Sequence, residues 1–367
     1  SSLVCAVTAQ GTLRTGEAPR LLQADSGALG VQLTISRPVQ RAVEAVAAST
    51  MTSGCILVLD TATAAVRASV SVPGYDPERL ADSLQAENSP FLNRALQSYA
   101  VGSVFKPVLA AAALEAGLQP VFECTGAVVV DGQIFRCAGG VPHGQVDLAA
   151  ALEKSCNGYF IRLGQQLGAE SLLDAAKAFG FGQSLPLAEG LAAEAGQLPA
   201  PQELAQSGQL ANFSFGQGSL LAAPMQVAAL FNTIAADGVY RSPYVLQATL
   251  DETTGQPVET LSHPRGRRVI SAQNAALLRA MLVQVVQQGT AQDAAGLSGG
   301  AGGKTGTAQT GQFTPEGTER CNLWFAGFWP AEKPRYTIVV LQDGAVHTAY
   351  SGATIFAQVC NALEAAG

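Results

Sequence analysis

The sequence predicts an α+β fold in which an N-terminal hairpin and a C-terminal meander share one antiparallel sheet flanked by helices. Two β-rich regions indicate this: residues 55–72 near one end of the chain, and a succession of β-type segments from Gly299 onward. The segments between them have mostly helical character, which predicts a mostly helical subdomain. Each β region must bury an apolar face, and pairing in one sheet is the simplest way for both to do so.

In the first half of the chain, residues 1–32 contain turn residues and no clear period, so we interpret them as an appendage to one domain at 33–367. Residues 31–50 predict a short strand and then a helix that begins near Pro38, a residue favoured in the first helical turn. The stretch CILVLDTATAAVRASVSV, residues 55–72, consists of two β-rich runs around a polar turn, which is typical of a hairpin. Residues 103–117 predict a helix that ends at Gly117.

In the second half, CTGAVVVDGQIFRC at 124–137 predicts another hairpin. Residues 146–168 favour two helical pieces interrupted at Ser155–Gly158, and further helices are expected at 169–179, 223–236 and 272–288. From Gly299, three β-type segments in succession predict the meander, and a helix closes the chain. Residues 185–210 fit no regular element.

Composition excludes some classes of function. The chain is 48% hydrophobic and 13% charged, with a net charge of −7, so it can bury a core but offers no basic surface for nucleic acid. No apolar run reaches the roughly 18–20 residues of a membrane helix. The first residues lack the features of a signal peptide. We therefore expect a soluble chain, from which an anchor could have been removed.

The seven cysteines show no C-x-x-C spacing, so we expect no metal site, and nothing indicates a cofactor. Cys124 and Cys137 flank the predicted second hairpin and could form a disulfide. The alternative is that most of the cysteines are small buried hydrophobic residues. Both alternatives remain open at this point.

The first chemical motif is Ser103-Val104-Phe105-Lys106. The chain has only five lysines, and Lys106 alone has a serine three positions before it. Residues three apart on a helix share a face, so the amine can reach the hydroxyl. Lysine can act as a base toward serine only if burial or a nearby positive charge lowers its pKa. The alternative is a capping serine beside a lysine that extends to the surface.

The second motif is Ser155-Cys156-Asn157, at the break between two helical pieces. A hydroxyl and an amide two residues apart in a loop can both point into a cleft, where they could relay a proton and hold a substrate carbonyl. Taken alone, these residues are better explained as helix caps than as a site, because Ser and Asn are standard N-cap residues.

The third motif is Lys304-Thr305-Gly306-Thr307, preceded by SGGAGG. On a strand, Lys304 and Gly306 face one way while Thr305 and Thr307 face the other. A glycine inside a strand marks a place where something approaches the backbone closely. The lysine and threonines would suit a substrate carboxylate, and the alternative is an ordinary strand with a glycine-rich lead-in.

Each motif is modest evidence, but the three in this chain order match the S-x-x-K, S-x-N and K-T-G elements of serine penicillin-binding enzymes. The chain also resembles the transpeptidase domain of a class B penicillin-binding protein from about Leu33 to its C-terminus. The similar segments include VQLTISRPVQRAVE, GCILVLDTATAAVRASVSVPGYDP, and GGKTGTAQ followed by WFAGFWP. NRALQSYAVGSVFKP resembles the run into the nucleophile, although the family usually has Pro-Gly-Ser where this chain has Val-Gly-Ser.

The resemblance implies a β-lactamase/transpeptidase-like fold and a role for each motif residue. Ser103 would be the acylated nucleophile, Lys106 its general base and Ser155 the proton relay. Asn157 would contact the substrate. The other implied substrate-binding residues are Lys304, Thr305, Gly306 and Thr307. The backbone N–H groups of Ser103 and Thr307 would form the oxyanion hole.

The resemblance further implies a peptidoglycan D,D-transpeptidase at the extracytoplasmic face of the bacterial membrane. Its partners would be peptidoglycan stem peptides, β-lactam antibiotics and cell-wall synthesis proteins. Family members carry a membrane anchor and a pedestal, of which residues 1–32 could be a remnant. The alternatives are a D,D-carboxypeptidase or β-lactamase-type hydrolase, or a β-lactam sensor. No Glu-x-x-Leu-Asn element supplies a deacylating base, which argues against a hydrolase.

Overall fold

The computed structural model describes residues 2–4, 20–22, 29–86, 88–263 and 265–366, which form two compact units. The smaller unit combines residues 1–33 with 246–263. In it, β1 (Ser2–Val4) pairs with β2 (Arg20–Leu22), and β15 (Leu246–Asp251) pairs with both β3 (Leu29–Leu33) and β16 (Pro257–Thr260). This pairing brings residues 246–263, which the sequence analysis placed in the domain at 33–367, together with the end of the predicted appendage. Residues 1, 5–19 and 23–28 of that appendage lie outside the described residues.

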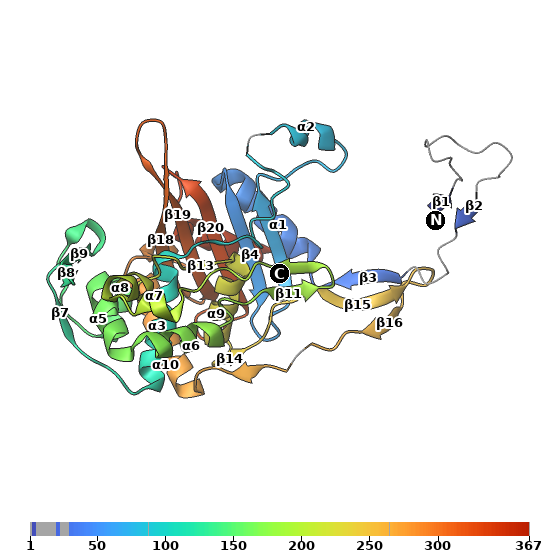
Figure 1. Cartoon of the computed structure of the whole chain (residues 1–367). Helices are drawn as coiled ribbons and strands as arrows, with labels where there is room; N and C mark the ends of the chain where they lie inside the picture. The colour runs from blue at the N-terminus through green and yellow to red at the C-terminus, as the bar shows by residue number, and fades with distance from the viewer. Residues whose placement is uncertain (1, 5–19, 23–28, 87, 264, 367) are drawn as a thin grey trace. The chain divides into compact units, whose positions relative to one another are not determined.

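The larger unit, residues 34–245 with 264–367, is built on a five-stranded antiparallel sheet in the order β18-β19-β20-β4-β5 (Figure 1). The N-terminal hairpin supplies β4 (Gly54–Asp60) and β5 (Val66–Val72). The C-terminal meander supplies β18 (Gly302–Phe313), β19 (Glu319–Trp329) and β20 (Tyr336–Ala345). The two meet where β20 pairs with β4, with Val340 opposite Ile56. The predicted sheet is therefore confirmed.

Helices cover both faces of this sheet. On one face α1 (Arg37–Thr50) packs against α11 (Gly352–Ala365), and Phe325 of β19 contacts Phe356 of α11 with ring centroids 4.6 Å apart. Val340 of β20 lies opposite Phe325, so its side chain is on the same face of the sheet as that of Phe325. Thr337 lies three residues from Val340 on the same strand, and its side chain therefore points to the other face. There the Thr337 hydroxyl donates to Asn232 Oδ1 of α9 (Pro224–Ala235) at 3.0 Å. Because both of its faces are covered, the sheet can be apolar throughout.

The remaining long helices form the predicted helical part of the larger unit. Its centre is α3 (Lys106–Glu115), which contacts α5 (Asn157–Leu167), α6 (Ala169–Ala178) and α10 (Ala272–Gln287). Figure 1 shows α5, α6 and α8 (Ser207–Ser214) gathered near α3, and α5 also packs against α8. Nearly every residue of α3 is buried, as expected for a helix that is apolar all round.

Short elements connect these parts. The helical ones are α2 (Leu80–Leu84), α4 (Leu148–Glu153) and α7 (Pro201–Leu204). The paired strands are β6 (Tyr99–Ala100) with β13 (Leu221–Ala222), β7 (Phe122–Cys124) with β10 (Gly144–Val146), β8 (Ala127–Val130) with β9 (Gln133–Arg136), β11 (Leu185–Ala188) with β12 (Leu191–Ala193), and β14 (Val239–Tyr240) with β17 (Arg267–Arg268). Within the described ranges, none of the helices combines the length and apolar character needed to cross a membrane.

Candidate active site

Ser103 lies in a single 3-10 turn, η1 (Gly102–Phe105), that leads directly into α3. Gly102 has a positive φ of 64°, and a Cβ there would lie 2.6 Å from the Thr307 carbonyl oxygen. Only glycine lets this turn approach β18 so closely. The sequence predicted one helix from residue 103, whereas the α-helix begins at Lys106. Pro107, which lacks an N–H, stands in the first turn of α3, where no intrahelical bond is required of it.

The Ser103 backbone N–H stands at the start of η1, where N–H groups have no partner within the helix. Among the described residues it has no backbone acceptor. The side chain is half-buried, and no hydrogen bond joins its hydroxyl to Lys106 Nζ in the described part of the chain. Ser103 therefore offers both an unengaged N–H and an accessible hydroxyl at the same turn.

Lys106 is fully buried, and its amine is held by the Ser155–Asn157 loop. Nζ donates to the Ser155 carbonyl oxygen at 2.7 Å, to Ser155 Oγ at 3.1 Å and to Asn157 Oδ1 at 2.7 Å. Burial lowers the pKa of Lys106 to about 7, against an opposing effect of the thiols of Cys156 and Cys137. A lysine that exchanges its proton near neutral pH can serve as a general base.

The loop that holds Lys106 has a constrained backbone. It joins the end of α4 to the start of α5, and Ser155 adopts a positive φ of 53°, which costs about 1–3 kcal/mol for a residue other than glycine. Cys156, rather than Ser155 or Asn157, is the N-cap of α5, with its sulfur accepting from Tyr159 N at 3.4 Å. Asn157 Nδ2 donates to the Arg136 carbonyl at 2.9 Å. These bonds turn both polar side chains toward Lys106.

The Lys304–Thr307 segment lies on β18, an edge strand of the sheet. The predicted alternation is present: Lys304 and Gly306 are buried, Thr305 is half-buried and Thr307 is exposed. A Cβ on Gly306 would lie 3.0 Å from Val104 Cγ1 and 3.1 Å from Val104 N, so glycine lets the strand lie against η1. The sequence analysis predicted that something approaches the backbone closely at this glycine. The approaching group is Val104 of η1.

Lys304 is fully buried beside the first lysine. Its Nζ donates to the Thr305 carbonyl at 3.2 Å. Burial, and secondarily the positive charge of Lys106, lowers the pKa of Lys304 well below its ordinary value. Two neighbouring buried amines disfavour each other's charge, so their proximity favours a neutral amine at neutral pH. Direct contact of Lys304 with a substrate carboxylate stays a prediction.

The Thr307 backbone is placed at the edge of the sheet that faces η1. Its carbonyl accepts from Gln217 Nε2 at 3.4 Å and lies close to Gly102. The N–H and C=O of one strand residue point to the same side, so the Thr307 N–H also points away from β19. The Ser103 and Thr307 N–H groups thus come from the two elements that meet at Gly102, and the oxyanion hole that they would form stays a prediction.

Thr290, just after α10, contacts a residue of the third motif, a contact that sequence reasoning missed. Its hydroxyl lies 2.8 Å from the Thr305 hydroxyl, and its N–H donates to the Glu153 carbonyl at 3.2 Å. Thr290 therefore ties β18 to the end of α4. The preceding Gly289 indicated only the end of a helix, and no local pattern distinguished the threonine from any other loop residue.

Of the two alternatives left open for Cys124 and Cys137, the described structure shows free thiols and no disulfide. The two sulfurs lie 3.6 Å apart, and both residues are free thiols, as are the other cysteines among the described residues. The two side chains are neighbours, as their positions flanking the hairpin suggested. A third sulfur, that of Cys156, lies 3.8 Å from Cys137 Sγ, so the environment is not that of an isolated pair.

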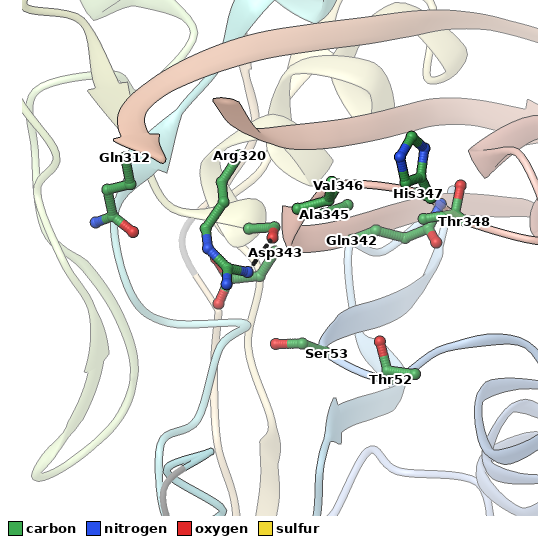
Figure 2. A pocket seen from close by; sticks show the side chains of 11 residues that line it. Thr52, Ser53, Gln312, Arg320, Gln342, Asp343, Ala345, Val346, His347 and Thr348 are labelled. Atoms are coloured by element: carbon green, nitrogen blue, oxygen red, sulfur yellow. Dashed lines mark hydrogen bonds between the residues drawn. The ribbon is translucent and has the colours of Figure 1, made fainter. Parts of the chain in front are cut away.

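A separate cavity of about 450 Å³ lies beside the ends of β18, β19 and β20, and Figure 2 shows the side chains that line it. Arg320 and Asp343 contribute charged groups to its wall. Its lining residues are Thr52, Ser53, Gln312, Arg320, Gln342, Asp343, Gly344, Ala345, Val346, His347 and Thr348. None of the site residues predicted from the sequence is among them, so this cavity is distinct from the motif cluster.

A serine turn beside a buried lysine of near-neutral pKa defines the class of serine–lysine acyl-transfer enzymes. Residues 54–363 match the family described as penicillin binding protein transpeptidase domain, and the chain belongs to that family. It is 32% identical to the peptidoglycan D,D-transpeptidase PbpA of Mycolicibacterium smegmatis, over 92% of this chain and 72% of that protein. It is also 32% identical to stage V sporulation protein D of Bacillus subtilis, over 79% of this chain but only 45% of that protein.

Solved structures agree with the sequence matches. The D,D-transpeptidase domain of a peptidoglycan glycosyltransferase from Eggerthella lenta is similar, with a TM-score of 0.82 at 27% identity over 92% of this chain and 84% of that one. A ceftriaxone acyl-enzyme complex of penicillin-binding protein A from Mycobacterium tuberculosis also gives 0.82 at 27% identity, over 92% and 80%. The predicted fold, the class B penicillin-binding family and the serine D,D-transpeptidase class are confirmed.

Proposed function

We propose that this chain cross-links peptidoglycan stem peptides through an acyl-enzyme on Ser103, and that β-lactams acylate the same serine. The observation that carries the proposal is the buried Lys106 amine, with a pKa of about 7, held by Ser155 and Asn157 and joined by one short turn to Ser103. Its relatives include a peptidoglycan D,D-transpeptidase and a penicillin-binding protein solved as a ceftriaxone acyl-enzyme, and both support this substrate class.

In the acylation step, neutral Lys106 accepts the Ser103 hydroxyl proton as Oγ attacks the carbonyl of the penultimate D-Ala. The protonated amine can hold three acceptors, which are the two oxygens of Ser155 and Asn157 Oδ1. Loss of one proton leaves a lone pair and two donors, so deprotonation frees the amine from one of these bonds. The negative charge on the carbonyl oxygen is stabilised by the N–H groups of Ser103 and Thr307.

Collapse of the intermediate breaks the peptide bond and releases the terminal D-Ala. The Ser155 hydroxyl, in contact with Lys106 Nζ, passes the proton to the leaving amine. An amine from a second stem peptide then attacks the ester on Ser103, and the Ser103 hydroxyl is restored. Thr305, Thr307 and Asn157 supply the polar contacts for the peptide. Such a reaction places the domain at the extracytoplasmic face of the cell membrane, where cell-wall synthesis proteins could recruit it.

The transfer reaction tests this proposal directly. A stem-peptide analogue ending in D-Ala-D-Ala is incubated with the protein and a D-amino acid acceptor, and the products are separated and weighed by mass spectrometry. We expect a product in which the acceptor replaces the terminal D-Ala, in an amount that rises with acceptor concentration. Formation of the hydrolysis product alone at every acceptor concentration would refute the transpeptidase proposal.

Acylation by penicillin should depend on pH in the direction set by Lys106. Burial depresses its pKa to about 7, so the neutral, basic form is scarce below that pH and predominates above it. The second-order rate constant for acylation is therefore expected to rise as the pH increases through about 7 and then to level off. Stopped-flow measurements with a fluorescent penicillin give the profile, and thermal unfolding at each pH controls for stability. A flat profile through this region would argue against Lys106 as the base.

The penicilloyl ester on Ser103 is expected to persist for many minutes or longer. Hydrolysis requires a water held against the ester by a second base, and the hydrogen bonds of the described residues join no carboxylate to Ser103, Lys106, Ser155 or Asn157. Dilution after acylation, followed by intact-mass measurements over hours, gives the deacylation rate. Turnover of many penicillin molecules per second would instead support the hydrolase alternative.

A further inference from the structure

Four side chains with metal-binding atoms converge beside the Ser155–Asn157 loop. They are Cys124 at the end of β7, Cys137 just after β9, His143 just before β10, and Cys156 at the N-cap of α5. One atom from each residue, three sulfurs and a ring nitrogen, lies within 4.8 Å of all the others. The three cysteines are buried and His143 is half-buried. A cluster of this composition is a metal-ligand set of the Cys3His type.

Three of the six separations among the four ligand atoms match the edges of a tetrahedron around zinc, and the others do not exceed 4.8 Å. Cys124 Sγ lies 3.6 Å from Cys137 Sγ, Cys137 Sγ lies 3.8 Å from Cys156 Sγ, and Cys124 Sγ lies 3.4 Å from His143 Nδ1. With Zn–S and Zn–N bonds of about 2.3 and 2.0 Å, the S···S and S···N edges are about 3.8 and 3.5 Å. The sulfur separations far exceed the bond length of about 2.05 Å of a disulfide.

The backbone holds the four residues in place. The His143 N–H donates to the Cys124 carbonyl and the Cys137 N–H to the Gly126 carbonyl, both at 3.0 Å. Gly126 has a φ of 89°, and a Cβ there would lie 2.2 Å from the Gly140 carbonyl oxygen, so the two loops can close only on glycine. The Tyr159 N–H donates to Cys156 Sγ, the kind of outer hydrogen bond that orients a thiolate ligand.

We propose that Cys124, Cys137, His143 and Cys156 bind one zinc ion that fixes the Ser155–Asn157 loop. Three thiolates and an imidazole fill a tetrahedral coordination shell, so the ion is structural and keeps no position open for substrate. Cys156 lies between the two residues that hold the Lys106 amine. The four ligands are therefore positioning residues for the loop, and zinc is anchored next to the serine–lysine pair without taking part in its chemistry. This site replaces the expectation of no metal drawn from the cysteine spacing.

Metal analysis tests the proposal. Protein purified with a reductant and supplied with zinc sulfate is desalted, and its zinc content is measured by elemental mass spectrometry for the wild type, Cys137→Ser and Cys321→Ser. Cys321, a half-buried free thiol on β19, is the matched control. We expect one zinc per chain in the wild type and in Cys321→Ser, and little in Cys137→Ser. Absence of zinc from the wild type, or full retention by Cys137→Ser, would overturn the proposal.

Cobalt replacement gives a readout independent of enzyme activity. Cobalt(II) added to metal-free protein should produce thiolate-to-cobalt charge transfer and the intense visible bands of a tetrahedral ion, and zinc should abolish both. Weak bands typical of octahedral cobalt, or a disulfide between any two of the three cysteines in zinc-supplied protein, would contradict the proposal. If Cys137→Ser does not fold, removal of zinc from the wild type with a chelator provides the same comparison.

The effect on the loop is measured separately. Chelation should slow the acylation of Ser103 by penicillin and lower the melting temperature, and added zinc should restore both. An unchanged acylation rate in fully metal-free protein would refute the positioning role of the ion. Zinc content is measured without any enzyme reaction. A protein that binds no zinc but is still acylated would contradict only the zinc proposal, and one that binds zinc but forms no transfer product would contradict only the proposed transpeptidase function.

Discussion

Replacing Ser103 with alanine is expected to abolish covalent labelling by penicillin and leave the fold intact. The hydroxyl is the only group at the η1 turn that can form the ester, and no hydrogen bond to Lys106 is lost with it in the described structure. Alanine is compatible with the helical backbone at this position. Labelling with a fluorescent penicillin, followed by electrophoresis under denaturing conditions, measures the loss.

The matched control is Ser262→Ala, which removes an exposed hydroxyl from the smaller unit and should label like the wild type. Thermal unfolding of both variants shows whether Ser103→Ala retains the native fold. A folded Ser103→Ala protein that still forms the adduct, with the label mapped to another residue, would show that the nucleophile is elsewhere.

Replacing Lys106 with arginine is expected to slow acylation about as much as replacement with alanine, by at least ~10²-fold. Arginine keeps the positive charge but cannot lose its proton at accessible pH. Its planar fork also cannot reproduce the three contacts that the buried amine makes with Ser155 and Asn157. Rate constants from stopped-flow acylation measure the effect.

Lys177→Arg, on the exposed side of α6, controls for the substitution itself and should acylate normally. Because Lys106 is fully buried, thermal unfolding must accompany each rate measurement. If Lys106→Arg acylated at nearly the wild-type rate, the lysine would act only through its charge and the base would lie elsewhere.

Local patterns predicted the larger unit well because its main elements have clear periods and end signals. The β-rich runs at 55–72 and after Gly299 each have to bury an apolar face, so burial alone predicted that they share one sheet. Ser103, Lys106 and the Ser155–Asn157 loop were identifiable because lysines are scarce and the three motifs occur in a specific order. Sequence could not show that the Lys106 amine donates its hydrogen bonds to Ser155 and Asn157 rather than to Ser103.

Features that depend on distant contacts were not predictable. Thr290 contacts Thr305 only because the end of α10 packs against β18. The Cys3His cluster lacks C-x-x-C spacing because two hairpins and a helix N-terminus bring its members together. Residues 185–210 showed no period since they contain two short strands, a single helical turn and only the first half of α8, pieces too short to display one.

Locating the penicillin adduct on the wild-type protein tests the central proposal most directly. The protein is incubated with penicillin, its intact mass is measured, and a protease digest is sequenced by tandem mass spectrometry. We expect a single added penicilloyl group, carried entirely by Ser103 within NRALQSYAVGSVFKP. An unmodified intact mass, or an adduct on any other residue, would contradict the proposal that Ser103 is the acylated nucleophile.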